Sequence, residues 1–177
     1  MENRAVIRPL YRRLLGAEFD RLGRHLRDFH DELGERRGQL QVKWGAGRLR
    51  HAVAWLLRMP PPRARSPVRL LASQRGAAEI WIRHFGSASL ITRQWERRGF
   101  LMEAAGPLTF QFEVSVDGGG MRFTQQRAWF LCVPLPRALA PVVAARVDPT
   151  QRGWEVEVTI SVPRLGVVAS YGGEMMR

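Results

Sequence analysis

The 177-residue sequence contains one cysteine and one lysine, and each scarcity excludes a class of protein. A lone Cys132 cannot form an intrachain disulfide or a cysteine metal cluster. Its neighbours Leu131 and Val133 are apolar, so we expect its thiol to be buried. Lys43 is the only lysine among 28 basic residues, although the net charge is +12. Because both lysine and arginine serve on phosphate, this imbalance argues against nucleic acid as a partner.

Long apolar runs and motifs of known chemistry are also missing. No stretch reaches the roughly 18 apolar residues of a membrane-spanning helix, and residues 1–10 lack the apolar run of a signal peptide. We therefore expect a cytoplasmic protein, either soluble or attached to a membrane surface. The histidines show no metal-binding spacing, and the sequence has neither a glycine-rich phosphate loop nor a nucleophile elbow, so we expect no metal and no cofactor.

Apolar periodicity divides the chain into a helical part and a strand-rich part. Steps of three and four predict a helix over residues 9–30 and a second over residues 48–58. A short strand is predicted over residues 39–44, and the proline-rich residues 60–67 are predicted to form an extended linker. Further strands are predicted over residues 68–71, 79–85, 89–95, 108–116, 122–133, 154–162 and 167–171. Residues 136–145 are expected to form a helix or an irregular crossing.

Short glycine-containing connections between these strands predict an antiparallel meander. We therefore expect one α+β domain over residues 1–177, in which residues 1–59 form a mainly helical cover. Residues 68–177 are expected to form a curved antiparallel sheet, resembling half of a barrel with six to eight strands, packed against the N-terminal helices. Such an arrangement leaves a pocket between the sheet and the helices unless side chains fill it.

Residues 81–86 give the strongest indication of a ligand site. In a strand, Trp81, Arg83 and Phe85 share one face. If that face is buried, the guanidinium of Arg83 needs an acidic partner, a path to solvent or an anionic ligand. Glu103 lies in an apolar stretch and is a candidate partner for Arg83, or an acid or base. The other predicted ligand-binding residues are the strand aromatics Phe110, Phe112 and Trp129.

Three functions remain open at this point. The first is binding of a hydrophobic or amphipathic small molecule in the predicted pocket, with any anionic group held by Arg83. The second is an enzyme that acts on such a ligand with Glu103 or His84 as acid or base. The third is a peripheral domain that uses the basic surface of residues 36–75 on an anionic membrane or a protein partner. This last hypothesis rests on ten basic and no acidic residues from Arg36 to Ala78.

Four motifs resemble a known family when they are taken in order along the chain. They are LYRRLLG at residues 10–16, WIRHFG at 81–86, EAAGPLTF at 103–110 and PLPRALAP at 134–141. Together they resemble bacterial proteins of the family Domain of Unknown Function 4166 over nearly the whole chain. The resemblance implies a domain that stands alone or accompanies a reductase-like or membrane module. It implies no catalytic residues.

Overall fold

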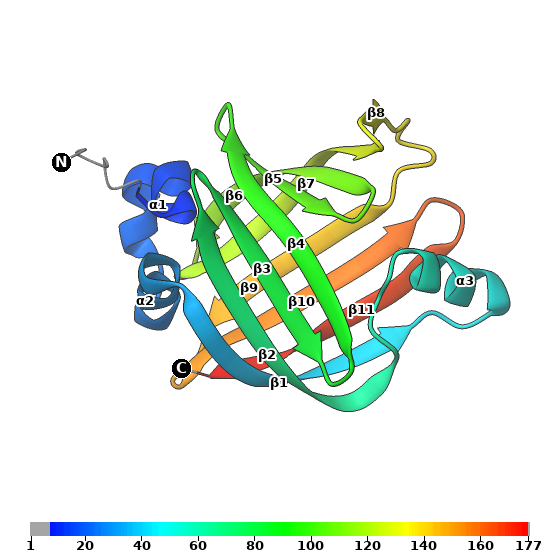
Figure 1. Ribbon diagram of the computed structural model, residues 1–177, viewed down its shortest axis with the longest axis horizontal. Helices are drawn as coiled ribbons and strands as arrows, with labels where there is room; N and C mark the ends of the chain where they lie inside the picture. Colours follow the sequence, from blue (N-terminus) through cyan, green and yellow to red (C-terminus); the bar gives the residue numbers. More distant parts are fainter. Residues whose placement is uncertain (1–7, 177) are drawn as a thin grey trace.

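The computed structural model describes residues 8–176, in which ten antiparallel strands form a closed barrel (Figure 1). The wall strands are β1 (Gly34–Trp44), β2 (Arg63–Arg75), β3 (Ala78–Phe85), β4 (Ala88–Arg97), β5 (Phe100–Ala105), β6 (Leu108–Asp117), β7 (Gly120–Phe130), β9 (Val142–Pro149), β10 (Gly153–Val162) and β11 (Gly166–Met176). Each pairs with two neighbours, and the ring closes where β1 meets β11. The two-residue strand β8 (Val133–Pro134) adds to the edge of β7.

The expected half-barrel of six to eight strands is therefore wrong. The sheet closes because β1 pairs with β11 along its length and because β7 pairs with both β6 and β9. Strand β5 was not predicted, and β9 begins within the segment 136–145 that was expected to be a helix or a crossing. A short apolar run fits the period of a helix as well as that of a strand, so periodicity alone could not decide the secondary structure of that segment. Strand β1 also starts earlier than predicted and lies in the wall, and β2 begins inside residues 60–67.

Tight turns build the continuous part of the wall from β2 to β7. Each connection has two residues, at 76–77, 86–87, 98–99, 106–107 and 118–119. Both residues have positive φ in two of these turns, at Arg98 and Gly99 and again at Gly118 and Gly119. This is the backbone of a type I′ turn, whose twist matches that of the strands it joins. Successive turns therefore fall at alternate ends of the barrel.

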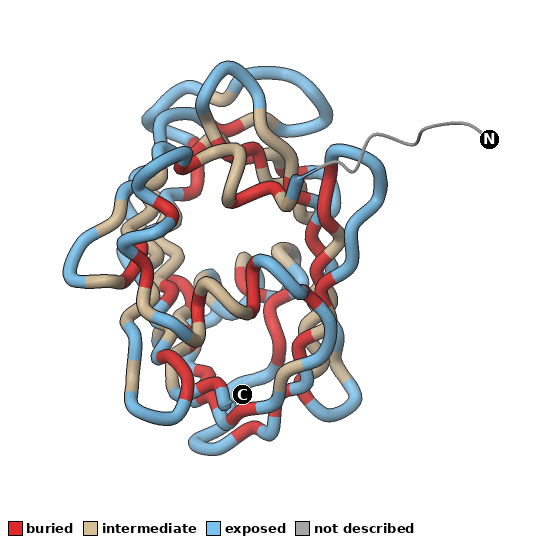
Figure 2. Tube along the Cα trace, turned by 90° about the vertical axis from the view of Figure 1, so that its left-hand side faces the viewer, coloured by how far each residue is buried: buried red, intermediate tan, exposed pale blue. Residues whose placement is uncertain are grey.

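The N-terminal helices cover one end of the barrel, which we call the plug end (Figure 1). They are α1 (Leu10–Leu15), the 3-10 helix η1 (Gly16–Arg21) and α2 (Arg24–Glu32). Arg13 Nη2 donates a hydrogen bond to the Ala77 carbonyl at 2.6 Å, and the Gly23 amide donates to the Gly119 carbonyl at 2.8 Å. Figure 2 looks onto this end, where strands encircle the barrel axis. The helices thus close one end of the barrel. The expectation that they pack along the concave face of an open sheet is wrong.

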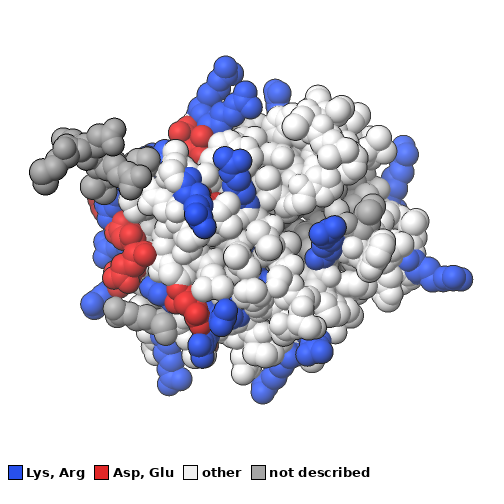
Figure 3. All heavy atoms as spheres, viewed as in Figure 1, with Lys and Arg blue, Asp and Glu red and all other residues white. Residues whose placement is uncertain are grey.

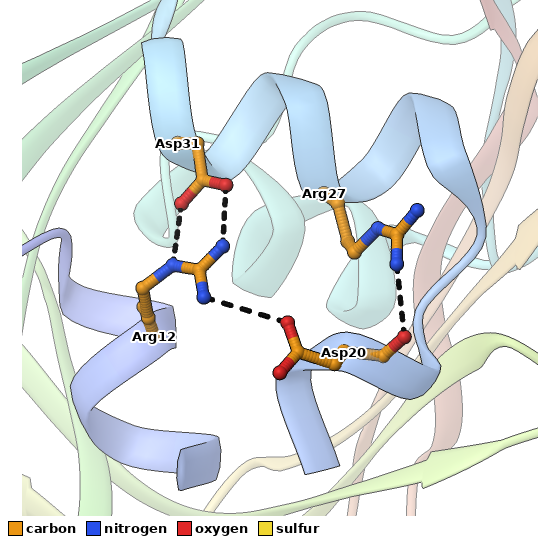
Figure 4. A network of polar contacts seen from close by, with 4 residues as sticks. All are labelled: Arg12, Asp20, Arg27 and Asp31. Carbon is orange, nitrogen blue, oxygen red and sulfur yellow. Dashed lines mark hydrogen bonds and ion pairs between the residues drawn. The ribbon is translucent and has the colours of Figure 1, made fainter. Parts of the chain in front are cut away.

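A group of ion pairs holds the three segments of the plug together (Figure 4). Arg12 in α1 donates from Nε and Nη2 to the two carboxylate oxygens of Asp31 in α2, at 2.8 and 2.7 Å. Its Nη1 lies 3.4 Å from Oδ1 of Asp20 in η1, and Arg27 Nη1 donates to the Asp20 carbonyl at 3.0 Å. The Arg12 guanidinium holds the pKa of Asp31 below its usual value. The plug is therefore a connected unit.

Helix α3 (Arg48–Leu56) lies at the opposite end, which we call the far end and which contains the connections 45–62, 86–87, 106–107, 131–141 and 163–165 (Figure 1). Arg50 Nε donates to the Leu165 carbonyl at 2.7 Å and fixes α3 beside the start of β11. Cys132 is exposed in this end, so its expected burial is wrong. Within residues 8–176, the helices are all too short or too polar to cross a membrane.

Candidate functional site

A cavity of about 120 Å³ lies inside the barrel, beneath the plug. All ten wall strands contribute side chains to it, together with α1 and α2. An eight-stranded barrel is just wide enough to be filled by its own side chains or to hold one small ligand, and width grows with strand number. Ten strands therefore leave space that the plug fills only in part. Small side chains of β9 and β10 enlarge this space: Val143, Ala145, Val147, Val156 and Val158.

The polar side of the cavity is formed by β3, β4 and β5. Arg83 Nη1 donates to Thr92 Oγ1 at 3.1 Å, and Arg83 Nη2 lies 3.8 Å from Glu103 Oε1. Gln94 stands opposite Glu103 in the strand register and donates from Nε2 to the same Oε1 at 3.0 Å. The hydroxyl of Tyr11, from α1, donates to Gln94 Oε1 at 3.0 Å. One polar chain therefore runs from the plug to the guanidinium in the wall.

Arg83 has hydrogen-bonding capacity to spare in this arrangement. Its side chain is 16% exposed and that of Glu103 is 20% exposed, so bulk water reaches both only in part. Among the described residues, Arg83 makes one hydrogen bond, to Thr92, while its ion pair with Glu103 is too long to be another. A guanidinium carries several more N–H donors. The structure therefore leaves donors of Arg83 at the cavity wall.

The plug side of the cavity is aromatic and uncharged at neutral pH. The rings of Tyr11 and His30 lie 4.0 Å apart between centroids. Burial lowers the pKa of His30 to about 3, and its Nδ1 has no hydrogen-bond partner among the described residues. Burial also raises the pKa of Tyr11 well above its usual value, and that of Tyr171 on β11. The Arg83–Glu103 pair is thus set in largely apolar surroundings.

The comparison with protein families decides what kind of chain this is. The model of a family described as a domain of unknown function, DUF4166, matches residues 22–175. The chain belongs to the DUF4166 family. The match contains α2 and nearly the entire wall of the barrel, so it confirms the resemblance seen in the sequence. No curated protein matches the chain.

A solved structure supports the barrel of this DUF4166 domain. It is the crystal structure of a protein with unknown function from the DUF3598 family of Nostoc punctiforme PCC 73102, with a TM-score of 0.55 and 14% sequence identity. The similarity covers 100% of this chain and 53% of that chain, so the present chain spans about half the length of that protein. At this identity the likeness shows the fold alone.

The DUF4166 barrel brings some of the predicted site residues together and separates others. Trp81, Arg83, Glu103 and Phe112 line the cavity. The other three predicted ligand residues, Phe85, Phe110 and Trp129, do not line it; the first two are buried in the core and the third is half-buried on β7.

His84 lies on β3 next to Arg83 and is not among the residues that line the cavity. Its ring Nδ1 is 2.8 Å from Ser89 Oγ, in an exposed pair. The structure therefore does not bring His84 to Glu103, and the role of either as acid or base stays a prediction.

Sequence reasoning missed the cavity residues that come from elsewhere in the chain. Tyr11 and His30 lie within the segment predicted to be a helix, where nothing marked them as site residues, and Gln94 gave no signal of its own. The alternation of Val143, Ala145 and Val147 was a usable signal for an inward strand face. The prediction of a helix or an irregular crossing over residues 136–145 concealed this signal.

Proposed function

We propose that this DUF4166 domain binds a small hydrophobic or amphipathic molecule inside its barrel. The observation that supports this is the cavity of about 120 Å³, whose lining is mainly apolar. For comparison, an engineered apolar cavity of about 150 Å³ in another protein stays dry and binds benzene. A single ring, or an aliphatic chain of similar bulk, is therefore the size of ligand that we propose.

The polar wall suggests which group such a ligand carries. The free donors of Arg83 face a ligand from one side, and a carboxylate accepts hydrogen bonds from a guanidinium in a paired geometry. The carboxylate of Glu103 competes for the same guanidinium from 3.8 Å. We therefore propose a ligand with an apolar body against β9 and β10 and a carboxylate at Arg83.

Benzoate and toluene test this proposal because they share a ring and differ in the carboxylate. Binding can be followed by tryptophan fluorescence, since Trp81 and Trp154 line the cavity. The variant Arg83→Met should weaken benzoate binding at least about tenfold, the value of a charge-assisted hydrogen bond, and leave toluene binding nearly unchanged. Arg93→Met is the matched control, because Arg93 is exposed on the same sheet and packs over Trp95.

A second variant separates the two carboxylates. Glu103→Gln keeps an oxygen that can accept the Gln94 hydrogen bond and removes the charge that competes for Arg83. Benzoate should therefore bind more tightly to this variant, while toluene binding stays the same. Absence of binding of both probes to the folded protein would refute the proposal. Equal loss of both probes in Arg83→Met would refute the role of the guanidinium. Native mass spectrometry of freshly purified protein is a separate measurement that identifies any molecule that co-purifies.

A further inference from the structure

We infer that the far end of the barrel docks on an anionic lipid membrane. This inference stands apart from the ligand proposal, because the docking surface uses side chains that do not line the cavity. It rests on two features that coincide at this end: unpaired arginines without nearby acidic residues, and exposed apolar side chains on separate connections.

Charge is distributed unevenly between the two ends of the barrel. No aspartate or glutamate occurs in the far-end connections or in the strand ends beside them. We call these the far-end segments: residues 45–66, 86–90, 106–107, 129–143 and 160–167. Their exposed arginines are Arg48, Arg58, Arg63, Arg65, Arg137 and Arg164. Within residues 8–176, none of these six has a carboxylate within ion-pairing distance. At the plug end of the same range Arg12, Arg21 and Arg24 are paired, whereas Arg97 and Arg152 are not. On the face shown in Figure 3, acidic side chains gather toward the plug end and only basic ones appear at the far end.

Exposed apolar side chains gather at the same end. Eight of the ten large apolar side chains that are exposed within residues 8–176 lie in the far-end segments, which shows that they are concentrated there. Trp55 on α3 is 74% exposed, and Leu131 and Leu139 in the connection before β9 are 67% and 64% exposed. Val167, at the start of β11, is 47% exposed. Two connections and the start of β11 therefore present exposed apolar side chains, at the end of the barrel that also contains the unpaired arginines.

This combination fits a bilayer better than the other partners of a basic surface. Tryptophan and leucine side chains partition into the headgroup boundary, and arginines beside them are attracted to anionic lipids. Nucleic acid would need a groove of charge lined by stacking aromatics, whereas six of the eight exposed apolar side chains in the far-end segments are aliphatic. A protein partner, such as a second copy of this chain, is an outcome that the test below distinguishes from a bilayer.

Vesicle flotation tests the inference with the full chain. Vesicles contain phosphatidylcholine alone, or phosphatidylcholine with one third phosphatidylglycerol. The first variant replaces apolar tips, Trp55→Gln with Leu139→Gln, and the second reverses charge, Arg48→Glu with Arg137→Glu. Control variants at the plug end are Arg97→Glu with Arg152→Glu, which changes the net charge equally, and Met176→Gln, which removes an exposed apolar side chain. All the replaced side chains are exposed, so folding should be retained, which urea denaturation checks.

The wild type should float with the phosphatidylglycerol vesicles and much less with phosphatidylcholine alone. The charge variant should reduce binding at least about tenfold, since each arginine near an anionic surface contributes roughly a fivefold increase in affinity. The apolar variant should also reduce binding at least about tenfold, because binding strength scales with the apolar area buried in the headgroup boundary. The plug-end controls should bind within about threefold of wild type, because a charge beyond the Debye length is screened. Equal losses in the two charge variants would show attraction by net charge alone and overturn the inference. So would absence of wild-type flotation, or a solution dimer that the far-end variants dissociate.

Discussion

Among single residues, His30 should make the stability of the barrel depend on pH in weak acid. Its pKa is about 3 in the folded protein and 6.5 when unperturbed, because burial disfavours the imidazolium. Between these values the unfolded chain binds a proton that the folded chain does not, so the free energy of unfolding falls as pH falls. The free energy of unfolding is therefore unaffected by titration of His30 above pH 6.5 and decreases progressively as pH falls toward 3.

We predict that His30→Phe removes this dependence. The free energy of unfolding of the wild type should fall by up to about 1.4 kcal/mol per pH unit across the window, and that of the variant should be flatter by this amount. Urea denaturation at several pH values measures both. His30→Gln is the control for ring packing against Tyr11, because it also cannot titrate in this window and should show the same flat profile. Parallel pH profiles for wild type and both variants would contradict the prediction.

Among the elements, helices α1 and α2 of the plug are joined through a single carboxylate. Asp31 in α2 receives two hydrogen bonds from Arg12 in α1, and this contact lowers the pKa of Asp31. A lowered carboxyl pKa means stabilisation that is present above the usual value of 3.8 and is lost as pH falls through the lower folded value. The helices of the plug should therefore separate more easily once this carboxylate is neutral.

We predict that Asp31→Asn lowers the melting temperature at neutral pH and speeds amide hydrogen exchange in α1. The difference from the wild type should shrink in strong acid, where Asp31 of the wild type is itself protonated. Asp28→Asn is a matched control on the same helix, because Asp28 meets Arg24 only at 3.8 Å. An Asp28→Asn protein that loses as much stability as Asp31→Asn would show that the contact with Arg12 has no special role.

Helices and strands with a strong local period were predictable from the sequence, but the closure of the sheet into a barrel was not. The helical stripe over residues 9–30 became α1, η1 and α2, and residues 48–58 contain α3. Trp81 and Arg83 were assigned to one inward face because alternation within a single strand decides it. Strand β5 and the seam between β1 and β11 gave no such signal, since pairing partners far apart in the chain leave no local pattern. The contacts of Tyr11 and Gln94 were hidden for the same reason.

For the molecule as a whole, the seam between β1 and β11 decides whether the sheet closes. Gly173 on β11 stands opposite Leu40 of β1 and has a φ of +145°, where other residues are strained. A Cβ at this position would clash with the backbone oxygen of Gln39 and lie 3.2 Å from the Cα of Leu40. Both are backbone atoms of the neighbouring strand, so relief of the clash requires the strands to move apart.

We predict that Gly173→Ala lowers the free energy of unfolding by at least about 2 kcal/mol, because it combines backbone strain with disruption of the closing seam. Gly118→Ala is the control, since Gly118 has a φ of +56° and a Cβ there would have nothing within 4 Å. It should cost about 1 kcal/mol, from backbone strain alone. Urea denaturation measures both, and equal costs would contradict a special role for the seam. Because every strand of the barrel lines the cavity, Gly173→Ala should also weaken binding of toluene, whereas Gly118→Ala should leave it unchanged.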